Sequence, residues 1–204
     1  MSSANKKLGI LQSGRGSNFL AIADSIDAGR LPGAEIAVVI SNRAEAQGIE
    51  VARTRNLPAL AIETMGRKRA EHDAEIISVL RDHEVDLVCL AGYMRLLSQE
   101  FVRAYPQRIL NIHPSLLPAF PGLDAQRQAL EYGVHYSGCT VHFVDEELDH
   151  GVIILQRAVL VLPGDDEATL SARILAEEHQ AYSEAISRVL SGKYAIVGRR
   201  YEVR

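Results

Sequence analysis

The 204-residue sequence has few cysteines, no long apolar run, no internal repeat and no large excess of charge. Its two cysteines, Cys89 and Cys139, each lie within an apolar stretch, which favours buried free thiols in a reducing compartment over a disulfide. Two isolated cysteines also lack the spacing of a zinc site. A chain of this length is sufficient to bury the core of one domain, which we expect to span residues 1–204.

The missing apolar runs and the modest charge also limit the partners. No stretch of 18 apolar residues is present, and the run after "MSSANKK" is too short for a signal peptide, so we expect a cytoplasmic protein with no membrane partner. The net charge of −4 gives no electrostatic attraction for nucleic acid. The basic segment "GRRYEVR" is interpreted as a solvated terminus.

Short apolar runs alternate with helical patterns in the first half of the chain. Strands are predicted at residues 7–13, 35–41, 58–63, 85–92 and 108–113, and helices at 17–29, 44–56, 68–83 and 98–105. In the helix at 68–83, Ala70, Ile77 and Leu80 have helical spacing, and Ser98 is placed to cap the next helix. This rhythm predicts an open, mostly parallel twisted sheet with helices on both faces, a Rossmann-like α/β fold.

The pattern changes in the second half of the chain. Strands at 137–144 and 151–163 follow each other without a helix between them, so they should pair antiparallel and extend the sheet. A long helix is predicted at 165–192, ended by Gly192, and a short final strand at 194–197.

Three polar motifs follow predicted strands: "SGRGSN" (13–18), "GYMRLL" (92–97) and "NIHPSLLP" (111–118). Ligands of open α/β sheets bind at the carboxyl ends of the strands, so we expect these motifs to converge.

The first motif favours a phosphate. Gly14 and Gly16 permit a tight turn, after which Ser17 or Asn18 opens a helix whose amides attract an anion. The motif is neither a Walker loop nor G-x-G-x-x-G, since Phe19 follows, so a phosphate monoester fits better than a nucleotide. A plain strand-to-helix turn explains this motif equally well.

The third motif favours an oxyanion site. Asn111 offers an amide donor and His113 an imidazole, a pair suited to polarising a carbonyl. Prolines 114 and 118 restrict the backbone, and the Leu117–Pro118 bond is a candidate for the cis form. The alternative is a rigid proline loop in which His113 has a structural role.

The acidic stretch "DEELDHG" (145–151) supplies a candidate partner for His113. We expect Leu148 to anchor this loop and Gly151 to turn it, so that Asp149 can orient and charge the imidazole. His142 shares a strand face with Thr140 and either supports the site or is simply buried and hydrogen-bonded. These histidines and Asp149 lack the spacing of a metal site, so no metal is expected.

Other nucleophiles are disfavoured. Ser115 lacks the G-x-S-x-G surroundings of a hydrolase serine, and Cys89 lies within an apolar strand.

With these motifs in order, the chain resembles the phosphoribosylglycinamide formyltransferases, a folate-dependent family. The resemblance rests on "SGRGSN", "LNIHPSLLPAFPGLDAQRQAL" and "TVHFVDEELDHG", and extends from about residue 7 to about residue 190. It implies transfer of the formyl group of 10-formyltetrahydrofolate, a co-substrate, to the amino group of glycinamide ribonucleotide in purine biosynthesis. It also implies these two small molecules as partners. We expect a monomer or homodimer.

The resemblance assigns roles to individual residues. Asn111, His113 and Asp149 match the catalytic residues of the family. Glu178, by position alone typical of a solvated helix face, matches a carboxylate that contacts the ribonucleotide. The remaining matches bind the ribonucleotide phosphate (Gly16, Ser17, Asn18) and the folate (Arg69, Met94, Arg95, Leu96, Leu97, with Asn111).

One position departs from the family pattern. Asp124 stands where many members have His, and we expect it to point away from the phosphate or to cap the helix that follows.

Three alternative functions make different predictions. Formyl transfer to methionyl-tRNA predicts a further C-terminal domain and a basic surface, and deformylation of the folate predicts an N-terminal regulatory domain. A non-catalytic folate- or nucleotide-binding domain would not need Asn111, His113 and Asp149 intact.

Overall fold

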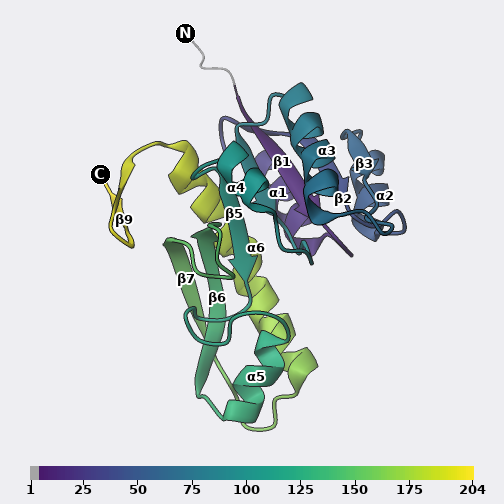
Figure 1. The fold of residues 1–204 in the computed structure, drawn as a ribbon. Coiled ribbons are helices and arrows are strands. Elements are labelled where there is room, and N and C mark those ends of the chain that lie inside the picture. The colour runs from purple at the N-terminus through teal and green to yellow at the C-terminus, as the bar shows by residue number, and fades with distance from the viewer. Residues whose placement is uncertain (1–4) are drawn as a thin grey trace. The chain divides into compact units, whose positions relative to one another are not determined.

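The computed structural model describes residues 5–204 (Figure 1). Seven strands follow the order β3-β2-β1-β4-β5-β6-β7 in one sheet, and β8 and β9 form a separate two-stranded sheet. The parallel pairs of the first strands and the antiparallel pair β6–β7 confirm the predicted fold class. The chain divides between Leu110 and Asn111 into two compact units, and the single domain over 1–204 stays a prediction.

The first unit contains the alternating strands and helices. Its elements are β1 (Lys6–Gln12), α1 (Ser17–Asp27), β2 (Ala34–Ser41), α2 (Gln47–Thr54), β3 (Ala59–Ala61), α3 (Arg69–Asp82), β4 (Leu87–Leu90) and α4 (Gln99–Ala104). β1 lies between β2 and β4 and is parallel to both. β4 is buried along its whole length, as a continuous apolar run predicts for a strand covered on both faces.

Helix α3 buries polar side chains that its hydrophobic pattern does not reveal. Ala70, predicted on the apolar face, is exposed, whereas His72 and Asp73 are buried. Nε2 of His72 lies 2.7 Å from the carbonyl oxygen of Ile62, and the Asp73 carboxylate accepts the backbone N–H of Ser98 at 2.6 Å. These partners satisfy the buried polar groups, and Asp73 thereby fixes the start of α4. Ser98 also caps α4, as predicted.

The second unit begins within β5 and is built around an antiparallel pair and a long helix. Its elements are β5 (Ile109–His113), α5 (Ala125–Tyr132), β6 (Tyr136–Phe143), β7 (Ile153–Leu160), α6 (Glu167–Leu190), β8 (Tyr194–Val197) and β9 (Arg200–Val203). Helix α6 packs along β6 and β7 (Figure 1). Within residues 5–204, every helix falls short of the length and apolar character that crossing a membrane requires.

The last strand, β9, is absent from the sequence prediction. The segment interpreted as a solvated basic terminus instead pairs antiparallel with β8. The rings of Tyr194 and Tyr201 stack at 4.8 Å between centroids, and both lie beside Phe143 at the end of β6. Aromatic contacts therefore hold a charged hairpin that the local pattern does not indicate.

Candidate active site

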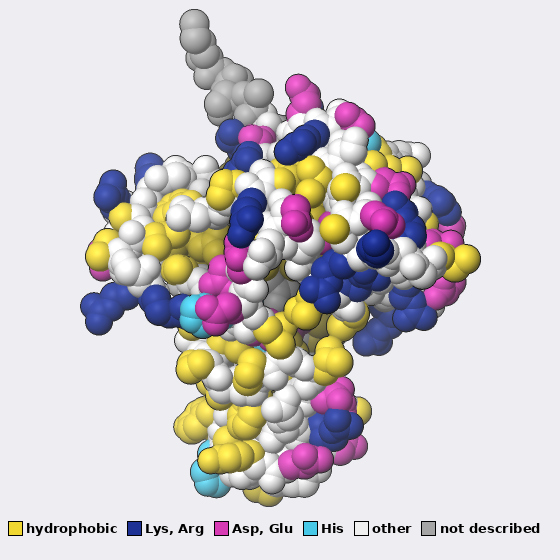
Figure 2. All heavy atoms as spheres, viewed as in Figure 1, with side chains coloured by type: hydrophobic (Ala, Val, Ile, Leu, Met, Phe, Trp, Pro, Cys, Tyr) yellow, Lys and Arg dark blue, Asp and Glu magenta, His cyan; other side chains and the backbone are white. Residues whose placement is uncertain are grey.

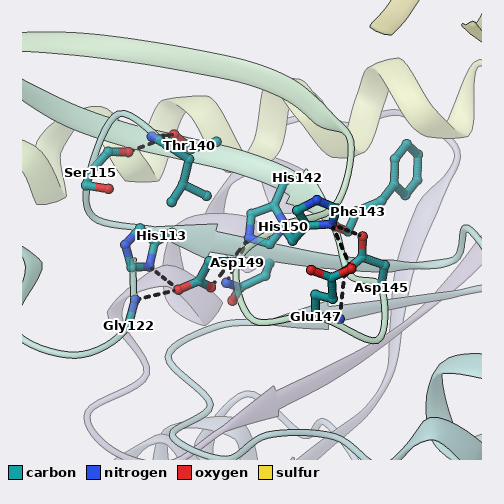
Figure 3. Close-up of polar contacts among 12 residues, drawn as sticks. His113, Ser115, Gly122, Thr140, His142, Phe143, Asp145, Glu147, Asp149 and His150 are labelled. Carbon is teal, nitrogen blue, oxygen red and sulfur yellow. Dashed lines mark hydrogen bonds and ion pairs between the residues drawn. The ribbon is translucent and has the colours of Figure 1, made fainter. Parts of the chain in front are cut away.

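His113, the last residue of β5, is buried between two oxygen atoms. Its Nδ1 lies 3.4 Å from Oδ2 of Asp149 (Figure 3). Its Nε2 lies 2.8 Å from the carbonyl oxygen of Phe120. Because both ring nitrogens face oxygens, the doubly protonated imidazolium can donate to both. The His113 and Asp149 side chains are only 6% and 9% exposed, so little water screens their interaction.

Asp149 is held in an uncommon backbone conformation. Its φ of 50° lies in the left-handed region, which disfavours most residues with a Cβ atom but which Asp tolerates better than most. Oδ2 accepts the backbone N–H of Gly122 at 2.8 Å (Figure 3). Gly151 turns the loop as predicted, because a Cβ atom there would lie 1.8 Å from the Phe143 carbonyl oxygen. The hydrogen bond from Gly122 and the turn at Gly151 thus hold the Asp149 carboxylate facing His113.

The predicted anchor of this loop is wrong. The Leu148 side chain is 54% exposed, because apolar character in a short loop does not guarantee burial. Polar contacts hold the loop instead. Asp145 accepts the backbone N–H of Glu147 at 3.0 Å, and its other oxygen lies 3.0 Å from Nδ1 of His150 (Figure 3).

His142 joins the cluster and orients Asn111. Nδ2 of Asn111 donates to Nε2 of His142 at 3.2 Å, and Nδ1 of His142 donates to the carbonyl oxygen of Phe143 at 2.7 Å. Burial lowers the pKa of His142 below its ordinary value of 6.5, so the ring is neutral at pH 7 and its Nε2 is an acceptor. The sequence left this role open, and the structure places His142 among the candidate catalytic side chains.

Hydrogen bonds from side chains of β6 and β7 hold the proline loop that follows His113. The Thr140 hydroxyl accepts the Leu117 N–H at 3.0 Å and donates to the Ser115 carbonyl oxygen at 2.7 Å. Gln156 donates to the Leu117 carbonyl oxygen at 2.9 Å. The Leu117–Pro118 bond is cis, as predicted. In residues 5–204 no group of three or more His, Cys, Asp or Glu side chains is arranged to hold a metal ion.

The first polar motif, in the first unit, forms a supported turn. Helix α1 begins after Gly16, whose φ is 77°, so the positive end of the helix dipole lies at this turn, which suits an anion. Gln12 accepts the N–H of Gly14 at 3.0 Å, and Gly48 donates to the Gly14 carbonyl oxygen at 3.1 Å. A Cβ atom on Gly48 would lie 2.7 Å from the Gln12 amide. The sequence reasoning missed both Gln12 and Gly48.

Ser13 joins the first and second motifs. Its N–H donates to the Gly92 carbonyl oxygen at 3.1 Å, and its hydroxyl accepts the Met94 N–H at 2.9 Å. The same hydroxyl donates to Asn42 at 2.6 Å. The expected convergence is therefore confirmed for these two motifs, whereas the inclusion of the third stays a prediction.

The candidate folate segment presents apolar side chains at the surface of the first unit. Met94 and Leu96 are 69% and 51% exposed, while Arg95 and Leu97 are half-buried. Arg69 is exposed at the first position of α3. The side chains of Met94 and Leu96 are therefore accessible to a ligand.

Glu178 is buried on α6 and so does not lie on a solvated helix face. Burial, and next the nearby Glu178 carboxylate, which repels a thiolate, raise the pKa of the Cys139 thiol to about 12. Both cysteines are buried free thiols, as predicted.

Asp124 occupies the N-cap position of α5 without capping it, so the capping alternative is wrong, whereas the alternative that Asp124 points away from the phosphate stays a prediction. Its backbone is left-handed, its side chain makes no capping hydrogen bond, and its carboxylate instead pairs with Arg127 one turn along the helix. The pair is half exposed, so it contributes little to stability.

Residues 6–186 match the formyl transferase family, and the chain belongs to that family. It is 44% identical over 189 residues to the phosphoribosylglycinamide formyltransferase of Escherichia coli (strain K12), covering 90% of this chain and 87% of that protein. A crystal structure of glycinamide ribonucleotide transformylase 1 from Symbiobacterium toebii superposes with a TM-score of 0.96 at 52% identity, covering 99% of this chain and 95% of that one. The trifunctional purine biosynthetic protein adenosine-3 of Drosophila pseudoobscura pseudoobscura is 47% identical over 94% of this chain, which spans 14% of that longer protein.

Proposed function

We propose that the chain transfers the formyl group of 10-formyltetrahydrofolate to the amino group of glycinamide ribonucleotide. The observation that carries the proposal is the cluster formed by half-buried Asn111, buried His113 and Asp149, whose side chain is 9% exposed. It occurs in a chain similar to the Escherichia coli phosphoribosylglycinamide formyltransferase over most of both lengths. A donor amide beside a carboxylate-paired imidazole suits an acyl-transfer reaction that passes through an oxyanion.

In the proposed reaction the amine nitrogen attacks the formyl carbon, and the carbonyl electrons move onto oxygen. One N–H of Asn111 is bound by His142, and its other N–H is available to the oxyanion. His113 adds positive charge, which Asp149 supports. When the oxyanion collapses, the bond to the folate nitrogen breaks. That nitrogen gains a proton and the new amide nitrogen loses one, with Asp149 relaying protons through water.

The substrate contacts that the sequence suggested form part of the proposal. The turn before α1 is proposed to bind the phosphate, and the buried carboxylate of α6 to contact the same ribonucleotide. The exposed apolar segment after β4 is proposed to contact the folate ring, and the first residue of α3 its glutamate carboxylate. The residues are Gly16, Ser17 and Asn18 for the phosphate, Glu178 for the ribonucleotide, and Arg69, Met94, Arg95, Leu96, Leu97 and Asn111 for the folate.

We further propose that the protein works in the cytoplasm as a monomer or homodimer. These two small molecules would be its partners, without nucleic acid, membrane or metal. The net charge of −4 supports the part of this proposal that concerns nucleic acid.

An acceptor comparison tests the function. The purified chain is incubated with 10-formyltetrahydrofolate together with glycinamide ribonucleotide, with methionyl-tRNA, or with no acceptor, and tetrahydrofolate, formate and formylated acceptor are quantified. The expected result is one formylated ribonucleotide for each tetrahydrofolate released. Release of formate at the same rate without an acceptor would identify a deformylase instead. Formylated tRNA would identify a methionyl-tRNA formyltransferase.

A further inference from the structure

The β8–β9 hairpin (194–203) lies beyond residues 6–186, which match the family. It belongs to the same unit as the loop 145–151 that carries Asp149. On the face shown in Figure 2, hydrophobic side chains gather near the C-terminal end of the chain, with Lys and Arg side chains around them. The hairpin therefore has both apolar and cationic groups with which to contact its neighbours.

Arg199 lies in the turn of the hairpin and contacts the loop 145–151 at His150. Its Nη1 lies 2.7 Å from Nε2 of His150, and its Nη2 donates to the His150 carbonyl oxygen. The same Nη1 also lies 3.3 Å from Nδ1 of His150, and Nδ1 in turn lies 3.0 Å from the Asp145 carboxylate. Because arginine can only donate, a ring nitrogen of His150 accepts from it. The side chains of Asp145, His150 and Arg199 thus connect the start of the loop to its end, and its end to the hairpin.

The hairpin also packs against the strand end from which the loop departs. The Phe143 ring lies 6.1 Å from that of Tyr194 and 6.5 Å from that of Tyr201. Phe143 is the residue whose carbonyl oxygen accepts from His142. The loop is thus held at both ends by residues outside the family match.

We propose that the β8–β9 hairpin is a brace that keeps the loop 145–151 in the conformation that presents Asp149 to His113, with Arg199 as its positioning residue. Asp149 needs such support because its left-handed backbone is unfavourable for a residue with a Cβ atom and Leu148 does not anchor the loop. The effect on catalysis rests on the proposed function, whereas the effect on the loop does not.

The kinetic test compares Arg199→Ala with Arg200→Ala, which removes the same charge from the neighbouring exposed position. For Arg199→Ala we expect kcat to fall about 10-fold, because the Asp149 carboxylate no longer faces His113. KM for glycinamide ribonucleotide should stay within about twofold of the wild type. Arg199→Lys should recover part of kcat, since lysine can donate to the same two atoms. His150→Ala leaves the His150 carbonyl oxygen for Arg199 to contact, so it should reduce kcat less, and the Arg199→Ala/His150→Ala double variant should fall no further than Arg199→Ala alone. Equal kcat in the Arg199→Ala and Arg200→Ala variants would overturn the proposal.

A second readout needs no activity. Amide hydrogen exchange across 145–150 is measured in the substrate-free full chain, and we expect it to be about 10-fold faster in Arg199→Ala but unchanged in Arg200→Ala. Unchanged exchange in both variants would refute the brace even in an active enzyme. Faster exchange in a chain that transfers no formyl group would retain the brace and reject the proposed function.

Discussion

The turn at residues 13–18 and the loop at 145–151 are held in place by different kinds of contact. The turn relies on glycines, backbone hydrogen bonds and the neutral amide of Gln12. The loop relies on titratable side chains and on a left-handed Asp149. The comparison shows that steric fit should dominate the behaviour of the turn, whereas charge and protonation should dominate that of the loop and its surrounding cluster.

The largest expected effect concerns the charged cluster. Asn111→Ala removes the proposed oxyanion donor and leaves Nε2 of His142 without the N–H that it accepts. We expect kcat to fall about 10²- to 10³-fold, as for other losses of an oxyanion donor, with little change in ribonucleotide binding. Steady-state kinetics and calorimetric binding measure the two effects. A kcat within fivefold of the wild type would remove Asn111 from the chemistry.

The turn should instead respond to a single methyl group. In Gly48→Ala the new Cβ atom would collide with Gln12, displacing the support beneath Gly14. We expect KM for glycinamide ribonucleotide to rise about 10-fold, equivalent to losing one hydrogen bond, with kcat nearly unchanged.

Gly14→Ala is the matched control for this substitution, because no atom lies within 4 Å of a Cβ atom at that position. If both variants raise KM equally, steric support from Gln12 is not the cause.

Protonation of His142 should couple the cluster to pH. Its lowered pKa means that the unfolded chain binds a proton that the folded chain rejects, so the free energy of unfolding should rise with pH up to about 6.5 and then level off. His142→Gln keeps a hydrogen-bonding side chain that does not titrate, so it should flatten this slope. Urea unfolding from pH 5 to 8 measures it, and parallel curves for the two proteins would contradict this role of burial.

The smallest expected effect lies where the two motifs of the first unit meet. Ser13→Ala removes the acceptor of the Met94 N–H, and should lower the free energy of unfolding by about 1 kcal/mol and raise KM for the folate about twofold. Ser78→Ala, at an exposed position of α3, is the control. Equal results for the two variants would show that this hydroxyl does not hold the folate segment.

The sequence could predict those features of the fold and of the candidate site that local pattern determines. Alternating apolar runs are local, so the order of strands and helices and the polar motifs at strand ends were accessible. Gly16, Asn111, His113 and Asp149 stood out because turns and strand ends concentrate function.

Contacts between distant residues were not accessible. His150 and Arg199 are 49 positions apart, and Asn111 and His142 are 31 apart. No local period marks such pairs, and the same holds for the buried His72 and for β9, whose charged residues resemble a solvated terminus. These features depend on tertiary contacts that override local pattern.

The most direct test of the account is the single-turnover rate of formyl transfer in Asp149→Asn. The Asn side chain retains an oxygen to accept the Gly122 N–H but loses the charge 3.4 Å from His113. We predict a rate about 100-fold below the wild type with ribonucleotide binding unchanged. A rate within twofold of the wild type across the pH range would contradict the proposal that Asp149 and His113 act together in catalysis.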